Sequence, residues 1–188
     1  MLLMALFLSG HRAAHNVMPR ILYALKLQPG DKFGSLEEQA CILADAIKRD
    51  GGELVALFTE DRAGPLDEYK ARGIDAYYLD LTRFRLKTAR ALTRIIEDHK
   101  IDIVHWNMQE PVRNPYLWYI TLRNPSVRHQ FTDHISRPAN DSGAAKGLVQ
   151  ALKSLALRRY EKIVCVSQFI QKSHEPQSAN LDVQYHFV

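Results

Sequence analysis

The chain has 188 residues, of which 46% are apolar and 24% are charged, with nine Gly and eight Pro. This composition excludes a wholly disordered or collagen-like chain, and the length suits one domain with a packed core. The 25 Lys and Arg exceed the 21 Asp and Glu by four, so the formal net charge is +4. This excess fits an anionic surface or a phosphate-bearing ligand and is too small to indicate nucleic acid as a partner.

The chain start and the cysteines bear on localisation. No stretch approaches the ~20 apolar residues that a membrane span needs. Residues 1–17 lack the basic start and the cleavage site of a standard signal peptide, so we expect a misassigned extension, with a weak signal peptide as the alternative. The domain itself is predicted over residues 18–188. Cys41 and Cys165 lie in apolar runs, which predicts two buried thiols in a reducing, cytoplasmic compartment.

Short β-rich runs alternate with longer helical patterns, which predicts an α/β fold: a Rossmann-like, mostly parallel sheet with helices on both faces. The first helix is predicted from a capping box in which the Ser35 hydroxyl caps the Glu38 amide and Glu38 reaches back. Gly51 and Gly52 end that helix. The predicted strands cover residues 21–25, 54–58, 76–79, 101–105, 127–132, 162–166 and 183–188, and the later helices cover residues 66–72, 87–99, 116–122 and 148–156.

Ligands of open α/β sheets bind outside the carboxyl ends of the strands, so the residues that follow each strand are candidate site residues. The first strand is followed by Gly30, Lys32 and Gly34, and then by the predicted helix start at Ser35. Such a loop can present amides to an anion, or it can be a simple turn. Neither the dinucleotide fingerprint nor the phosphate-binding Gly-Lys-Ser/Thr motif is present, which disfavours standard nicotinamide and ATP sites.

Two histidines end or follow strands: His105 after the fourth strand and His134 after the fifth. Either could hydrogen-bond a substrate hydroxyl or transfer a proton, and the alternative is a satisfied buried histidine. A metal site of His129, Asp133 and His134 is disfavoured, because consecutive strand residues point to opposite faces. Ser167 is better explained as a helix cap than as a nucleophile, since no Gly-x-Ser-x-Gly motif is present.

Two basic helical stretches could contact anionic lipid, although solvated helix faces are the commoner explanation of such stretches. Their cations are Arg83, Arg85, Lys87, Arg90 and Arg94 in one stretch, and Lys146, Lys153, Arg158 and Arg159 in the other.

Four segments in the same order resemble the N-terminal half of a family-four, GT-B-fold glycosyltransferase. The turn at Gly34 to Glu37 resembles the family's Gly-Gly-x-Glu turn, and Ile101 to His105 is similar to its Pro-Asp-ϕ-ϕ-His strand, where ϕ is apolar. Thr132-Asp133-His134 matches its Thr-x-His motif, and residues 162–170 resemble the strand and serine that close the domain.

This resemblance implies the acceptor-binding half of an enzyme that moves a sugar from a nucleotide donor to a glycan or lipid-linked acceptor with retained configuration. It implies His134 as the catalytic residue near the transferred sugar and the Gly34 turn as the donor-phosphate side. Asn107, Glu110 and Asp133 are added as candidate contacts. The resemblance implies no metal ion and no other cofactor, and a nucleotide-sugar donor only where a second domain is supplied.

Three departures from the family pattern accompany the resemblance. Ser35 replaces the second glycine, Asp133 stands before the histidine, and the chain has about half the expected length, without a donor domain. Glu60 and Glu68 are eight residues apart, as in the family's acidic pair, but they lie in the wrong half. The alternative functions are a non-catalytic carbohydrate-, lipid- or protein-binding module and an unrelated nucleotide-binding domain. Peripheral contact with the inner face of a membrane fits the glycosyltransferase function.

Overall fold

A computed structural model describes residues 18–27, 34–59, 66–108, 114–134, 154–168, 171 and 181–183 of the chain. The chain divides into two compact units between Ile103 and Val104, within one strand. The predicted α/β, Rossmann-like fold is confirmed: strands and helices alternate, and the described pairs β1–β2, β2–β3, β5–β6 and β6–β7 are parallel.

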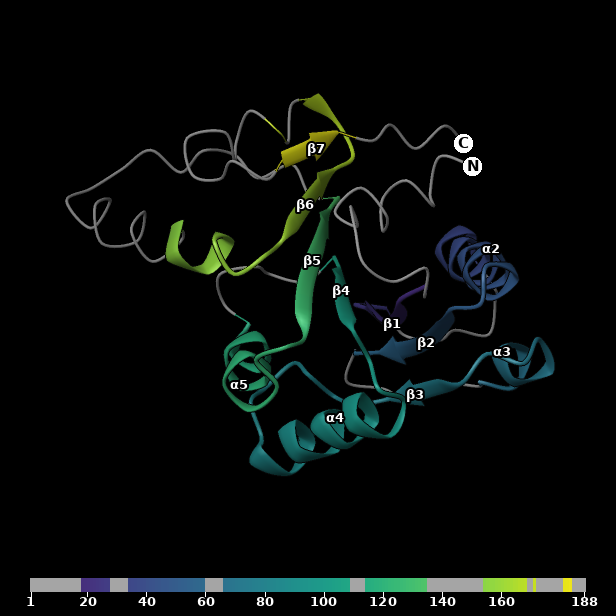
Figure 1. Ribbon diagram of the computed structural model, residues 1–188, viewed down its shortest axis with the longest axis horizontal. Coiled ribbons are helices and arrows are strands. Elements are labelled where there is room, and N and C mark those ends of the chain that lie inside the picture. Colours follow the sequence, from purple (N-terminus) through teal and green to yellow (C-terminus); the bar gives the residue numbers. More distant parts are fainter. Residues whose placement is uncertain are drawn as a thin grey trace. The chain divides into compact units, whose positions relative to one another are not determined.

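The first unit contains three neighbouring strands in the order β3-β2-β1 (Figure 1). In β2 every residue after Glu53 is buried, which shows that both faces of the strand are covered. The elements of this unit are β1 (Arg20–Leu25), α2 (Ser35–Arg49), β2 (Glu53–Phe58), α3 (Asp67–Ala71), β3 (Ala76–Tyr78) and α4 (Leu86–Asp98).

The helices of the first unit bury the apolar stripes that the sequence predicts. In α2 the described members of its stripe are all buried: Ala40, Leu43, Ala44 and Ile47. Gly51 ends this helix with φ of +84°, a conformation that disfavours a side chain. In α4 the buried residues are Ala89, Leu92, Ile95 and Ile96.

The second unit contains four neighbouring strands in the order β4-β5-β6-β7. The interiors of β4, β5 and β6 are again buried on both faces, and Cys165 is a buried cysteine as predicted, as is Cys41 in the first unit. The elements are β4 (Ile103–Asn107), α5 (Pro115–Arg123), β5 (Arg128–Asp133), β6 (Lys162–Cys165) and β7 (Leu181–Val183). No helix among the described residues is long and apolar enough to cross a membrane.

Two predicted strands have different positions in the structure. The fourth begins at Ile103 instead of Ile101, because the Ile101 N–H still bonds to the Ile96 carbonyl of α4 at 2.9 Å. The Asp102 carboxylate then accepts a hydrogen bond from the backbone N–H of Arg20 at 2.8 Å. Asp102 therefore belongs to the connection from α4. The last strand covers Leu181–Val183 instead of residues 183–188, with Leu181 paired to Ile163. Residues 184–188 lie outside the described residues.

The predicted capping box is wrong by one residue. Helix α2 begins at Ser35, so Gly34 is the N-cap, with extended backbone. The carboxylate of Glu37, and not that of Glu38, reaches back to the Gly34 N–H at 3.2 Å. A Cβ on residue 34 would lie 2.8 Å from the Glu37 carboxylate, so a side chain there would require this carboxylate, the far end of a flexible side chain, to move.

Candidate functional site

The carboxyl ends of β4, β5 and β6 are adjacent in the second unit. The Met108 N–H donates to the Thr132 carbonyl at 3.3 Å, and the Val166 N–H donates to the Asp133 carbonyl at 3.3 Å. These bonds bring the end of β4, at Asn107, beside the end of β5. This edge therefore holds four of the predicted site residues: His105, Asn107, Asp133 and His134.

Alternation along the strands sorts these residues between two faces of the sheet. His105 Nε2 lies 2.8 Å from the Thr132 hydroxyl, so the two side chains share a face. Because successive strand residues point to opposite faces, Asn107 and His134 belong to the same face and Asp133 to the other. His134 and Asp133, neighbours in sequence, therefore do not converge on one ligand atom.

His105 is a buried member of the polar face, by which we mean the sheet face that carries His105, Asn107, Thr132 and His134. It is buried, and burial lowers its pKa to about 3, with the nearby His134 and Lys162 acting in the same direction and Gln130 opposing them. The imidazole is therefore neutral at physiological pH. A neutral imidazole can still form the hydrogen bond to Thr132. His105 therefore acts as a positioning residue for the end of β5.

On the opposite face of the same strands, buried side chains join β4, β5 and α5 through hydrogen bonds. Trp106 Nε1 donates to His129 Nδ1 at 3.3 Å, and His129 Nε2 lies 3.4 Å from the Thr121 hydroxyl. Because the indole N–H can only donate, His129 must carry its proton on Nε2. Burial lowers the pKa of His129 to about 4, so this histidine is a neutral link between β4, β5 and α5.

The chain leaves β4 through a strained residue. Met108 has φ of +60°, in the left-handed region that side chains other than glycine, Asn or Asp seldom adopt. Strain of this kind is often retained beside functional sites. Glu110, the candidate contact two positions later in the sequence, lies outside the described residues.

The N-terminus of α2, in the first unit, is the other predicted site feature. The Gly34 N–H is already bonded to the buried carboxylate of Glu37. An anion at this turn would therefore have to displace a negative charge before it could use that amide. Of the other predicted residues here, Ser35 is the first residue of the helix and Lys32 lies outside the described residues.

Sequence reasoning missed two features of the second unit. Asn114 caps α5 by accepting the N–H groups of Tyr116 and Leu117 at 3.1 and 3.2 Å, and Pro115 follows at the first helical position. The Asn-Pro pair is a recognisable signal for such a start. The second feature is Gln130, which period-two alternation with Thr132 and His134 could have placed on the polar face.

The family model that matches the chain is Glycosyltransferase Family 4, over residues 36–182. The chain belongs to this family. The match confirms the family that the four motif-like segments indicated. No curated protein matches the chain in sequence.

Solved structures show the same fold at low sequence identity. A glycosyltransferase from Rickettsia africae is 18% identical with a TM-score of 0.63, and Anabaena Alr3699/HepE in complex with UDP and glucose is 12% identical with a TM-score of 0.57. Each match covers 90% of this chain and 43% or 45% of the other chain. An alpha-glucosyltransferase in complex with UDP and DNA is 16% identical with a TM-score of 0.51, and the match covers 89% of this chain and 41% of that one.

These matches identify the fold as that of the N-terminal half of a GT-B glycosyltransferase. The chain spans less than half the length of each of these structures.

Proposed function

We propose that this chain is the acceptor-binding half of an enzyme that transfers a sugar, with retained configuration, from a nucleotide-sugar donor to a glycan or lipid-linked acceptor. The observation that carries the proposal is the polar face at the carboxyl ends of β4 and β5, in a chain of family 4. Parallel α/β sheets bind their ligands at this edge. The proposed setting is the cytoplasmic side of a membrane.

The proposed roles follow from the position of each side chain. His134, at the end of β5, hydrogen-bonds the transferred sugar or the acceptor hydroxyl and is the catalytic residue. Asn107 offers an amide to an acceptor hydroxyl on the same face, and the neutral His105 holds Thr132 in place beneath them. Asp133 lies on the opposite face of the sheet. Its role in acceptor binding is therefore indirect.

The chemistry of the transfer explains why the donor phosphates need their own contacts. Breaking the sugar–phosphate bond builds positive charge at the anomeric carbon and negative charge on the leaving diphosphate. The Gly34 amide is the proposed donor to that diphosphate, with Lys32 in the preceding loop. Since the Glu37 carboxylate now accepts from this amide, donor binding requires that the carboxylate turn away.

The experiment measures acceptor binding and turnover with the same protein. Saturation-transfer NMR of the chain with a panel of glycans and a lipid-linked sugar analogue should show binding, while transfer from UDP-sugars stays below detection. His134→Gln should weaken acceptor binding roughly three- to tenfold through one lost hydrogen bond. Arg128→Gln, at the amino end of the same strand, is the matched control and should bind normally. Equal binding by both variants, or robust turnover by the chain alone, contradicts the proposal.

A basic, apolar loop of the first unit supports a lipid-linked acceptor. The loop follows β3 and leads into the first turn of α4, so Phe84 lies in the loop and Leu86 begins the helix. Both side chains are 48% exposed, and their neighbours in sequence are Arg83, Arg85 and Lys87. Asp80 fixes the start of this loop: it accepts from the Thr82 N–H at 3.0 Å and pairs with Arg85 at 3.1 Å. Ordered apolar side chains among cations are suited to an anionic membrane surface.

Membrane contact is tested by vesicle co-sedimentation. The chain should bind vesicles that contain an anionic lipid, should bind neutral phosphatidylcholine vesicles far more weakly, and should lose affinity as salt rises. The double variant Phe84→Ser/Leu86→Ser should bind anionic vesicles at least tenfold more weakly. Ile42→Ser removes a 57% exposed apolar side chain elsewhere in the unit and should have no effect. A double variant that binds like the control disproves the contact.

A further inference from the structure

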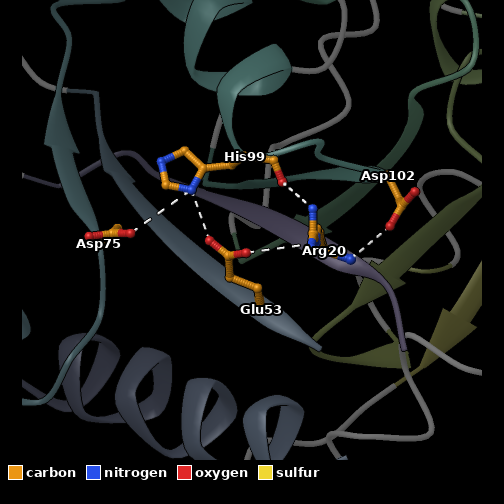
Figure 2. Close-up of polar contacts among 5 residues, drawn as sticks. All are labelled: Arg20, Glu53, Asp75, His99 and Asp102. Carbon is orange, nitrogen blue, oxygen red and sulfur yellow. Dashed lines mark hydrogen bonds and ion pairs between the residues drawn. The ribbon is translucent and has the colours of Figure 1, made fainter. Parts of the chain in front are cut away.

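Three potential metal ligands converge at the amino ends of the strands in the first unit (Figure 2). Glu53 begins β2, Asp75 directly precedes β3, and His99 is the C-cap of α4. His99 Nδ1 lies 2.8 Å from Glu53 Oε1 and 3.9 Å from Asp75 Oδ2, and all three ligand atoms lie within 4.8 Å of one another. The ligands therefore lie at amino ends of strands, whereas the proposed function uses carboxyl ends.

Tyr77 orients the imidazole toward the two carboxylates. The Tyr77 hydroxyl lies 2.8 Å from His99 Nε2, and the two rings meet edge to face with centroids 5.6 Å apart. Histidines that bind metals characteristically bond to a second group through the other ring nitrogen. In the tautomer that donates Nε2–H to Tyr77, the Nδ1 lone pair is available to a metal ion, whereas in the other tautomer Nδ1–H donates to Glu53 and Nε2 accepts from Tyr77.

We propose that Glu53, Asp75 and His99 bind a divalent transition metal ion, with Zn²⁺ the best match. One imidazole and two carboxylates form a donor set that Zn²⁺ accepts, with bonds of about 2.0–2.2 Å. Such bonds place tetrahedral ligand atoms about 3.3–3.5 Å apart. The distances of 2.8 and 3.9 Å from His99 Nδ1 lie on either side of that value, so small side-chain movements complete the site.

The surroundings give the ion access and an open position for water. Glu53 and Asp75 line a cavity of about 250 Å³, and the Asp75 side chain is 67% exposed. The cavity also has Asp45 in its lining, together with the cations Lys48 and Arg72. Its charges nearly balance, so binding depends on the three ligand atoms and not on a general negative field.

Arg20 contacts the oxygen of Glu53 that the metal would not use. Its Nε lies 3.7 Å from Glu53 Oε2, while Oε1 faces His99. Its backbone N–H bonds to Asp102, and its guanidinium reaches the His99 carbonyl at 3.5 Å (Figure 2). Arg20 therefore holds Glu53 and the end of α4 in position. Its charge also opposes a dication, so we expect a site of moderate affinity.

The test titrates Zn²⁺ into the chelator-treated chain by calorimetry and follows the ring signals of His99 by NMR. Wild-type protein should bind one Zn²⁺ with a change in the His99 signals. Asp75→Asn should weaken this binding at least tenfold, and this exposed substitution leaves the core intact. Asp45→Asn removes the same charge from the same cavity without removing a ligand, and it should bind like wild type. Identical binding by the two variants, or unchanged His99 signals, overturns the proposal.

Tyr77→Phe provides a second measurement. It keeps the ring contact with His99 and removes the hydroxyl that bonds to Nε2. Loss of such an orienting partner lowers metal affinity by about ten- to a hundredfold. An unchanged affinity in Tyr77→Phe would contradict the orienting role of this hydroxyl. A loss confined to Tyr77→Phe and Asp75→Asn, with Asp45→Asn unaffected, supports the site as described.

Discussion

Lowering the pH from 7 to 5 is expected to destabilise the second unit by about 4 kcal/mol. His105 and His129 are buried, and burial lowers their pKa values to about 3 and about 4. In the unfolded chain both titrate near pH 6.5. Between pH 4 and pH 6.5 the unfolded state binds two protons that the folded state does not. The unfolding free energy is therefore at its full value above pH 6.5 and decreases as the pH is lowered below it. Each histidine supplies about half of the effect.

Urea unfolding followed by tryptophan fluorescence checks this expectation, because both tryptophans, Trp106 and Trp118, lie in the second unit. The informative quantity is the difference in unfolding free energy between pH 7 and pH 5. His105→Gln and His129→Gln should each reduce that difference by about 2 kcal/mol, whatever their stability at pH 7. A difference that is the same in wild type and in both variants would show that other groups govern the acid response.

Trp106→Ala is expected to cost about 3–5 kcal/mol of unfolding free energy. The Trp106 side chain is fully buried, so truncation leaves a large cavity in a packed core. It also removes the N–H donor to His129 Nδ1, which leaves a buried acceptor unpaired at an additional cost of about 1–3 kcal/mol. Trp106→Phe keeps much of the volume and isolates the cost of the lost hydrogen bond.

Trp118 is the matched control, since it is the other tryptophan of the chain and is partly exposed in α5. The Arg159 guanidinium lies over its ring at 5.6 Å. An exposed cation–π contact contributes about 0.5–1 kcal/mol, so Trp118→Ala should cost about 1 kcal/mol together with the lost packing. Far-UV circular dichroism during urea unfolding suits all three variants. Similar costs for Trp106→Ala and Trp118→Ala would contradict the assigned core position.

Local patterns predicted most elements to within a residue or two. Apolar runs such as Leu54 to Phe58 form strands because burial on both faces requires uninterrupted apolar residues, and Gly51 ends α2 because it adopts a positive φ. The capping box at Ser35 and Glu38 was wrong because the choice between adjacent caps depends on backbone conformation. Gly34 is extended and Ser35 is helical. The sequence alone allows either residue to be the N-cap, with Glu37 or Glu38 as its partner.

Contacts between distant segments decided the remaining boundaries. Ile101 and Asp102 read as a continuation of the apolar strand, but Asp102 is bonded to Arg20, 82 positions earlier. No window around residue 102 contains that partner. The start of β4 at Ile103 therefore depends on tertiary structure.

The sequence by itself determined the family, the parallel α/β fold and the strand ends where the candidate site residues lie, because these depend on motif order and on periodicity within each segment. Only the tertiary structure decided which of those residues share a face, since register between β4 and β5 sets His105 beside Thr132 and Trp106 beside His129. It likewise brought Glu53, Asp75 and His99 together from three elements. Such convergence depends on the crossover connections between parallel strands and on the pairing of those strands. Neither leaves a periodic signal in the sequence.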